Sequence, residues 1–140
     1  MGSKIQFPAK IHELKRALAW LRSHLEKAGL EKKEILRLEL VLEEAFVNSI
    51  QHAYRGKEGL VELEFKHLPD QTIEFAISDF GPPFNPLKEG PQVDITLPIE
   101  EREAGGLGIY LMQHCIDDVR YFRKEEKNTL IFIKRFSQTK

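Results

Sequence analysis

The chain has 140 residues with 21 Lys and Arg against 22 Asp and Glu, a formal net charge of −1. At about 150 residues per domain we expect a single domain, residues 1–140, and the near-neutral charge excludes the basic excess typical of a dedicated nucleic-acid binder. A single cysteine excludes an internal disulfide framework, and without an apolar span or a signal peptide we expect a cytoplasmic protein with no membrane contact.

The first half of the chain predicts a short strand followed by two helices. Residues 4–8 alternate in polarity and end in proline, which is typical of an edge strand. Apolar residues then recur at three- and four-residue steps over residues 11–28, and Gly29 follows where a helix C-terminus is expected. A second helix is predicted from about residue 31 to 53, with an apolar arc so broad that other elements must cover most of it.

The second half begins with two strands and a long irregular segment. Residues 60–65 and 72–77 combine β-forming residues with alternating polarity, and residues 68–71 between them are a candidate hairpin turn. Residues 80–105 are rich in proline and too broken for a long element. A connection of about 25 residues inside a compact domain is usually functional or mobile.

One more helix and two strands complete the predicted order. The helix runs from Gly105 to about Ile116, and the strands cover residues 118–124 and 129–136, on either side of a polar turn at residues 125–128. The order β-α-α-ββ-loop-α-ββ predicts an α+β domain in which one layer of about three helices covers one face of a mostly antiparallel sheet.

Three polar side chains follow one side of the second predicted helix. Glu44, Asn48 and His52 are separated by steps of four residues, which places them on one line. A solvated helix face explains the spacing equally well, but asparagine is a poor helix former and usually has a reason to lie in mid-helix. A carboxylate beside an amide oxygen suits a hard cation such as Mg²⁺, which completes its shell with phosphates and water.

Two further motifs contain glycine. Asp79 ends a predicted strand and Gly81 follows, an ordinary turn pattern. The functional alternative is that Asp79 accepts a hydrogen bond from an exocyclic amine such as that of adenine, while Gly81 lets the backbone approach a ring. Residues 105–108 place glycines at a helix start, where backbone N–H groups and the helix dipole make an anion site. A flexible hinge is the alternative for this segment, which matches neither common phosphate-binding pattern.

The order of these features along the chain resembles the N box, G1 box, ATP lid and G2 box of the GHKL ATPase superfamily. Within it, the chain is similar to the RsbW/SpoIIAB-type anti-sigma-factor serine protein kinases. The matching segments are residues 44–48 with 52–54, residues 79–86, residues 105–112 with 117–119, and residues 128–130 with 134–135. The resemblance covers nearly the whole chain and implies a two-layer, Bergerat-type ATP-binding fold with a lid over about residues 85–104.

The resemblance implies a role for each matching residue. Glu44 is implied to be the general base that deprotonates a serine hydroxyl of a protein substrate, and Asn48 to bind the Mg²⁺ that bridges the ATP phosphates. Asp79 is implied to bind the adenine amino group, with Gly81 giving the ring room and Thr129 helping through a water molecule.

The phosphates are implied to bind the glycine-rich segment, at Gly105, Gly106, Leu107 and Gly108. Arg102 lies further from these glycines than the arginine of related lids. A phosphate clamp and a surface residue paired with a neighbouring glutamate are therefore equal alternatives for it. His52 and Phe84 are interpreted mainly as packing residues.

As a whole, the resemblance implies an ATP- and Mg²⁺-dependent serine/threonine protein kinase and anti-sigma factor that regulates transcription by partner switching. Its expected partners are a sigma factor and a STAS-domain anti-sigma antagonist, which it phosphorylates on serine. The alternative is a nucleotide-dependent binding module with weak or no kinase activity, although retention of both Glu44 and Asn48 favours the enzyme. Family members are commonly homodimers, and sensor histidine kinases carry an additional phosphoacceptor helix pair for which we expect this chain to be too short.

Overall fold

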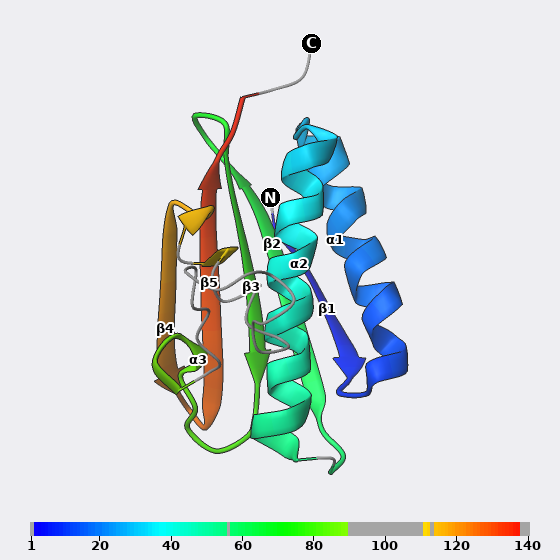
Figure 1. The fold of residues 1–140 in the computed structure, drawn as a ribbon, viewed down its shortest axis with the longest axis vertical. Helices are drawn as coiled ribbons and strands as arrows, with labels where there is room; N and C mark the ends of the chain where they lie inside the picture. The colour runs from blue at the N-terminus through cyan, green and yellow to red at the C-terminus, as the bar shows by residue number, and fades with distance from the viewer. Residues whose placement is uncertain (1, 56, 90–110, 113, 138–140) are drawn as a thin grey trace, which may run out of the picture.

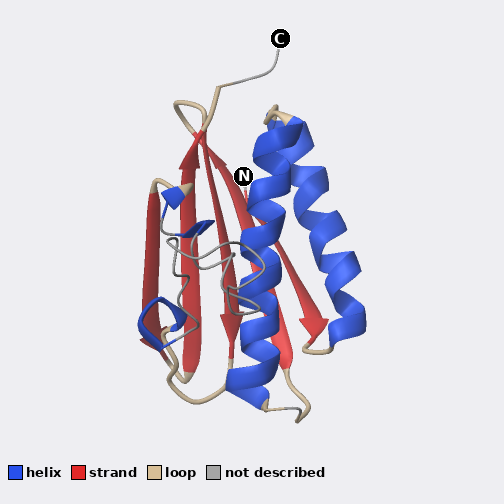
Figure 2. Ribbon diagram, viewed as in Figure 1, coloured by secondary structure: helices blue, strands red, loops and turns tan. Residues whose placement is uncertain are grey.

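The protein is a two-layer α+β domain in which helices cover one face of a five-stranded sheet (Figures 1 and 2). The structure is a computed structural model and describes residues 2–55, 57–89, 111–112 and 114–137. The sheet has the order β1-β2-β3-β5-β4, and its four pairings are all antiparallel. The strands are β1 (Gly2–Pro8), β2 (Leu60–Leu68), β3 (Thr72–Asp79), β4 (Asp118–Lys124) and β5 (Lys127–Arg135). The predicted α+β class and antiparallel sheet are confirmed.

The helical layer starts with a 3₁₀ turn, η1 (Ile11–Glu13), which leads into α1 (Leu14–Ala28). Gly29 ends α1 in the left-handed conformation, with a φ of 97° that glycine adopts at little cost. The next helix, α2 (Lys32–Asn48), runs back alongside α1 and continues into one π-helical turn, η2 (Ser49–Tyr54). Both predicted helices are therefore present, but the change from α- to π-helical geometry at the end of α2 was not predicted.

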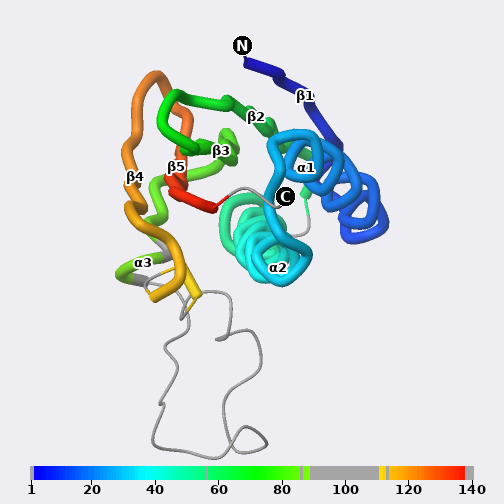
Figure 3. Tube along the Cα trace, turned by 90° about the horizontal axis from the view of Figure 1, so that it is seen from above, coloured from blue at the N-terminus to red at the C-terminus, as the bar shows by residue number. Residues whose placement is uncertain are grey.

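The hydrophobic core lies between the helices and the sheet. Seen from above, α1 and α2 lie on the same side of the sheet (Figure 3). Phe75 of β3 and Phe132 of β5 are direct cross-strand partners, and their rings stack with centroids 4.8 Å apart. Phe46 of α2 is fully buried as well. Aromatic pairs of this kind stabilise a core beyond the area that they bury.

The β4–β5 turn is tighter than the sequence predicts. The expected turn covers residues 125–128, whereas β5 already begins at Lys127. Glu125 and Glu126 form the turn with positive φ angles of 54° and 62°. Asn128 is consequently a strand residue.

Much of the predicted loop and the start of the third helix lie at residues 90–110, outside the described residues. Before that gap the loop contains one short helix, α3 (Pro86–Glu89). After it, residues 111, 112 and 114 are helical, and the chain enters β4 at Asp118. None of the helices that the structure describes is long and apolar enough to cross a membrane.

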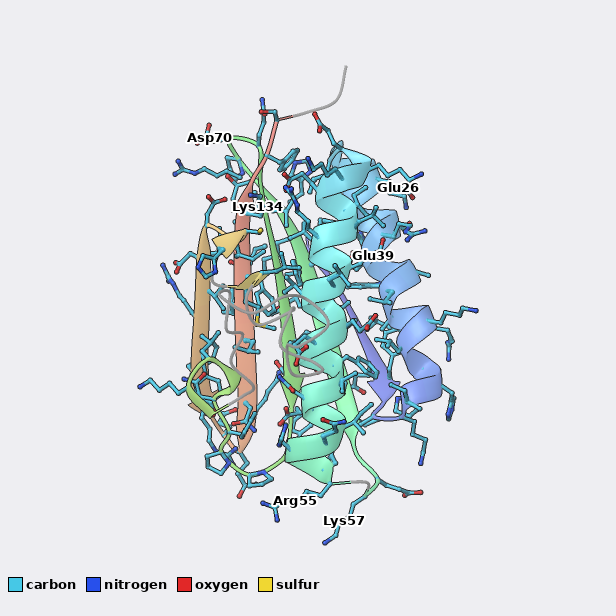
Figure 4. All side chains as sticks on the ribbon, in the orientation of Figure 1. Glu26, Glu39, Arg55, Lys57, Asp70 and Lys134 are labelled. Carbon is cyan, nitrogen blue, oxygen red and sulfur yellow. The ribbon has the colours of Figure 1, made fainter. Side chains whose placement is uncertain are left out.

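The three segments that carry polar motifs meet at one end of the domain. The C-terminal end of α2, the end of β3 and the start of β5 all lie there (Figure 1). Arg55 and Lys57 mark this end in Figure 4, and Asp70, in the β2–β3 turn, marks the opposite end. The fold therefore gathers residues about 30 and 80 positions apart in the sequence.

Phe132→Ala is expected to lower the free energy of unfolding by about 3–5 kcal/mol, because removal of a fully buried ring leaves a cavity. The matched control is Phe122→Ala on the neighbouring strand, where the ring is 44% exposed, and this change should cost less than about 1 kcal/mol. Urea denaturation followed by circular dichroism measures both. Equal losses would contradict the assignment of the core to the helix-covered face.

Candidate functional site

A small pocket lies between α2 and the β3–β5 pair. Its polar wall comes from two of the predicted motifs and from the last two strands, β4 and β5. The polar residues that line it are Asn48, Ser49, Asp79, Tyr121, Asn128 and Thr129. The fold therefore brings the N-box and G1-box residues to one place, as expected from the sequence pattern.

Glu44 and Asn48 lie one turn apart on α2, and both are buried, with exposed fractions of 9% and 4%. Asn48 lines the pocket. Its Nδ2 is buried and has no hydrogen-bond partner among the described residues. Because an unpartnered buried amide is costly, this side chain is available to a ligand or a metal-bound group.

The Glu44 carboxyl is poised to exchange a proton near neutral pH. Burial, followed by the charge of the neighbouring Glu43, raises the pKa of Glu44 to about 7. At pH 7 the side chain is therefore present in both protonated and ionised forms. Such a group is suited to general acid–base chemistry.

The π-helical turn η2 joins the helix to the turn that follows β3. Ser49 Oγ donates a hydrogen bond of 3.0 Å to Asp79 Oδ2. Ala53 packs directly against Gly81, where an added Cβ would lie 2.5 Å from the Ala53 Cβ. This close approach is a reason for glycine at position 81 that is independent of any ligand. Single π-helical turns are frequent at functional sites.

Two aromatic residues of η2 hold the same turn. His52 stacks on Phe84 with ring centroids 4.5 Å apart and an interplanar angle of 11°. Tyr54 Oη accepts a hydrogen bond of 2.8 Å from the Phe80 N–H and donates one of 2.6 Å to the Leu60 carbonyl. Both side chains are thus used to pack the turn against η2.

Asp79 receives three hydrogen bonds and is only 8% exposed. Its Oδ2 accepts from Ser49 Oγ at 3.0 Å, and its Oδ1 accepts from the Gly81 N–H at 3.1 Å and from Asn128 Nδ2 at 2.8 Å. A carboxylate has about four acceptor positions, so these donors leave capacity for a further N–H from a ligand.

Asn128 belongs to the site although the sequence analysis assigned it to a turn. It lies directly across from Asp79 in the β3–β5 pairing and is 4% exposed. Its Nδ2 also donates to the Pro82 carbonyl at 2.9 Å. Its Oδ1 accepts from Tyr121 Oη at 2.5 Å and from Arg123 Nη1 at 3.2 Å. Asn128 therefore ties the turn after β3 to both C-terminal strands.

The Thr129 side chain lies on the face of the sheet opposite to Asp79, and its implied role through a water molecule stays a prediction. Thr129 contributes to the pocket wall, but it is the next residue along β5, so its side chain lies on the opposite face of the sheet from that of Asn128. Its hydroxyl shares a hydrogen bond of 2.9 Å with Ser78 Oγ. The polar β5 side chain beside Asp79 is therefore Asn128 and not Thr129.

The remaining predicted site residues lie outside the described residues. They are Arg102, Gly105, Gly106, Leu107 and Gly108. In the part of the chain that is described, no group of three or more His, Cys, Asp or Glu side chains could hold a metal ion. A hard cation at Asn48 would therefore take most of its ligands from phosphate oxygens and water, which is the usual arrangement for Mg²⁺.

Comparison with known proteins finds relatives over most of the chain. Residues 7–134 match the family described as the histidine kinase-like ATPase domain. The serine-protein kinase RsbW of Listeria innocua is 28% identical over 125 residues, which cover 86% of this chain and 79% of that protein. The protein of the same name from Bacillus thuringiensis strain Al Hakam is 28% identical over 132 residues, covering 91% of this chain and 81% of that protein.

Two solved structures share the fold. The RsbU and RsbW domains of a Mycobacterium tuberculosis protein match with a TM-score of 0.69 at 16% identity, over 99% of this chain and 33% of that chain. The catalytic domain of the histidine kinase ThkA matches with a TM-score of 0.53 at 18% identity, over 95% of both chains. At these identities the likeness concerns the fold alone.

Gly81→Ala is expected to lower the free energy of unfolding by about 1–3 kcal/mol, because the added Cβ overlaps Ala53 and pushes the turn away from η2. Gly2→Ala is the matched control, since its Cβ would meet its nearest neighbours at an ordinary 3.6 Å. This change should stay within about 0.5 kcal/mol. Thermal and urea unfolding of both variants measure the difference, and an unchanged Gly81→Ala variant would contradict the close packing.

Proposed function

The chain belongs to the family of histidine kinase-like ATPase domains, and on this basis we propose that it is a cytoplasmic, ATP- and Mg²⁺-dependent serine protein kinase and anti-sigma factor. Its proposed substrate is a serine of a STAS-domain anti-sigma antagonist, and its second proposed partner is a sigma factor. The relatives named serine-protein kinase RsbW support this role. β1 lies at the edge of the sheet, where its outer side is available for the homodimer that the resemblance implies.

The observation that carries the proposal is the pairing of Glu44 and Asn48 on one turn of α2. One is a carboxyl whose pKa is about 7, and the other is a buried amide that lines the pocket, whose oxygen can bind a metal and whose unpartnered Nδ2 can donate to a phosphate oxygen. A base and a metal ligand are the two groups that phosphoryl transfer to a serine requires from this helix, because positioning and charge neutralisation do most of the remaining work.

Each described side chain has one task in the proposed reaction. When bound, Mg-ATP supplies the transferable phosphoryl group and neutralises its charge. Glu44 in its ionised form takes the proton from the substrate serine at a carboxylate oxygen. Asn48 offers its amide oxygen to the metal, and Asp79 accepts the exocyclic N–H of adenine in its remaining acceptor position.

Glu44→Gln is expected to reduce phosphate transfer by about 10²–10⁴-fold, because the amide cannot accept the serine proton. ATP binding should persist, since Glu44 does not line the pocket. Mass spectrometry of the antagonist after incubation with Mg-ATP measures transfer, and calorimetry measures ATP binding. Glu43→Gln removes the adjacent, exposed carboxyl and is the matched control, for which transfer should persist.

Two outcomes of this experiment oppose the proposal in different ways. Equal transfer by Glu44→Gln and the unaltered protein would show that Glu44 is not the base. ATP binding by the unaltered protein without any phosphorylated product would favour the nucleotide-dependent binding module over the kinase.

The transfer rate is expected to rise with pH through a midpoint near 7, because the base acts only when ionised and the pKa of Glu44 is about 7. Below the midpoint the rate should fall by about tenfold for each pH unit. Glu43→Gln should move the midpoint to lower pH, since it removes a neighbouring negative charge that raises the pKa of Glu44. Single-turnover rates between pH 5.5 and 8.5 test this, and a flat profile would contradict the assignment.

A further inference from the structure

Three residues in one row of the sheet connect a carboxylate to a guanidinium. Asp79 of β3 is the direct cross-strand partner of Asn128 on β5, and Asn128 is the direct partner of Arg123 on β4. Asn128 Nδ2 donates to Asp79 Oδ1 at 2.8 Å, and Asn128 Oδ1 accepts from Arg123 Nη1 at 3.2 Å. The amide therefore lies between an obligatory acceptor and an obligatory donor.

The orientation of the Asn128 amide follows from these neighbours. An arginine side chain can only donate, so it requires the amide oxygen on its side. On the other side, Asp79 and the Pro82 carbonyl can both accept from Nδ2. Rotating the amide by 180° would place N–H groups against the guanidinium and an oxygen against the carboxylate. Arg123 on one side, and Asp79 and the Pro82 carbonyl on the other, together determine which end of Asn128 faces Asp79.

Arg123 is itself fixed by a second acceptor. Its Nη1 donates to the Gly81 carbonyl at 2.7 Å, in the turn directly after β3. Tyr121 Oη adds a hydrogen bond of 2.5 Å to the same Asn128 oxygen. The row is therefore held at both ends, and Asn128 is 4% exposed within it.

The fixed orientation of the Asn128 amide means that, among the described residues, Asp79 is contacted by donors only. Its three described partners, namely Ser49, the Gly81 N–H and Asn128, all donate to it. A carboxylate surrounded in this way offers a ligand an acceptor and no proton. A purine with an amino group at C6 donates to it from that position, whereas a purine with a carbonyl oxygen at C6 presents a second acceptor there and is repelled by the carboxylate. Sites that hydrogen-bond a substrate N–H strongly reject analogues that lack the group, because a buried partner is then left unpaired.

We propose that Asn128, oriented by Arg123, is a positioning residue that holds Asp79 as an acceptor and so determines the preference of the pocket for 6-amino over 6-oxo purine nucleotides. The inference rests on the proposed nucleotide-binding function and deepens it. Asn128 acts here through Asp79 and is not a catalytic residue. A residue that merely stabilised the turn would affect both kinds of nucleotide equally.

The test compares ATP with inosine triphosphate, which carries a carbonyl oxygen in place of the amino group. Calorimetry on the full chain gives the dissociation constant of each nucleotide with Mg²⁺ at pH 6 and pH 8. The unaltered protein is expected to prefer ATP by at least about tenfold at both pH values. Binding of neither nucleotide would refute the proposed function itself, and equal binding of both would refute the present inference.

Asn128→Asp is the informative variant because it keeps the size of the side chain. The new carboxylate faces Arg123 and Tyr121, which favour its charged form, and it presents an oxygen to Asp79 where Asn128 presents an N–H. Asp79 then loses a donor and is repelled from its position beside the ligand, so the preference for ATP should fall by at least about tenfold at both pH values.

Asn128→Ala is the second variant and keeps the proposal testable if the first does not fold. Without the amide, Asp79 is no longer held toward the ligand, so the dissociation constant should rise for ATP and remain within about threefold for inosine triphosphate. Phe122→Ala is the matched control. It changes an exposed side chain of β4 next to Arg123 that does not line the pocket and takes no part in the hydrogen bonds between Asp79, Asn128 and Arg123, and it should leave the ratio of the two constants unchanged. Parallel weakening of both nucleotides in either Asn128 variant would overturn the inference.

Discussion

The hydrogen bond between Asp79 and Asn128 is the contact on which the rest of the site depends. A carboxylate that is 8% exposed loses most of its hydration, and that loss is severe unless donors replace the water. Here the donors come from three separate segments: Ser49 on η2, the backbone at Gly81, and Asn128 on β5. Satisfying one buried charge thus fixes the relative positions of the helix end, the turn after β3 and the last strand.

The close contact between η2 and the turn follows from this requirement. Ser49 can reach Asp79 only if the end of the helix lies against the turn, and the gap is so small that position 81 must lack a side chain. The helix changes from α to π geometry at Ser49, directly after Asn48. A π-helical turn is less favourable than an α-helical one and is retained where surrounding contacts require it. The contacts of Ser49, Ala53 and Tyr54 with the turn supply that requirement.

The parts of the fold that local chemistry determines could be predicted from the sequence. Gly29 ends a helix because it adopts a positive φ at little cost, and the alternating residues of β2 and β3 distinguish a buried from an exposed face. Glu44, Asn48 and Asp79 could be found because their order along the chain resembles a known family. Asn128 lies in a segment that matches the family, but it was also assigned to the turn, because neither Glu125 nor Glu126 is the glycine or asparagine that usually indicates a two-residue turn with positive φ. Thr129 was expected near the adenine base only because the resemblance implies it; the register pairs Asp79 with Asn128 instead, and adjacent residues of a strand lie on opposite faces.

The two carboxyl groups of the site, those of Asp79 and Glu44, lie in different surroundings. Asp79 is surrounded by donors that stabilise a carboxylate, and these donors are held by the strand pairing. For Glu44 the main influences are burial and the adjacent charge of Glu43, which together raise its pKa to about 7. Asp79 accepts hydrogen bonds from three protein donors and is suited to recognition, whereas Glu44 changes its protonation state near neutral pH and is suited to proton transfer. This division places the binding of the base at the sheet and the chemistry on the helix, so that changes at Asn128 should alter which nucleotide binds without altering the pH at which Glu44 acts.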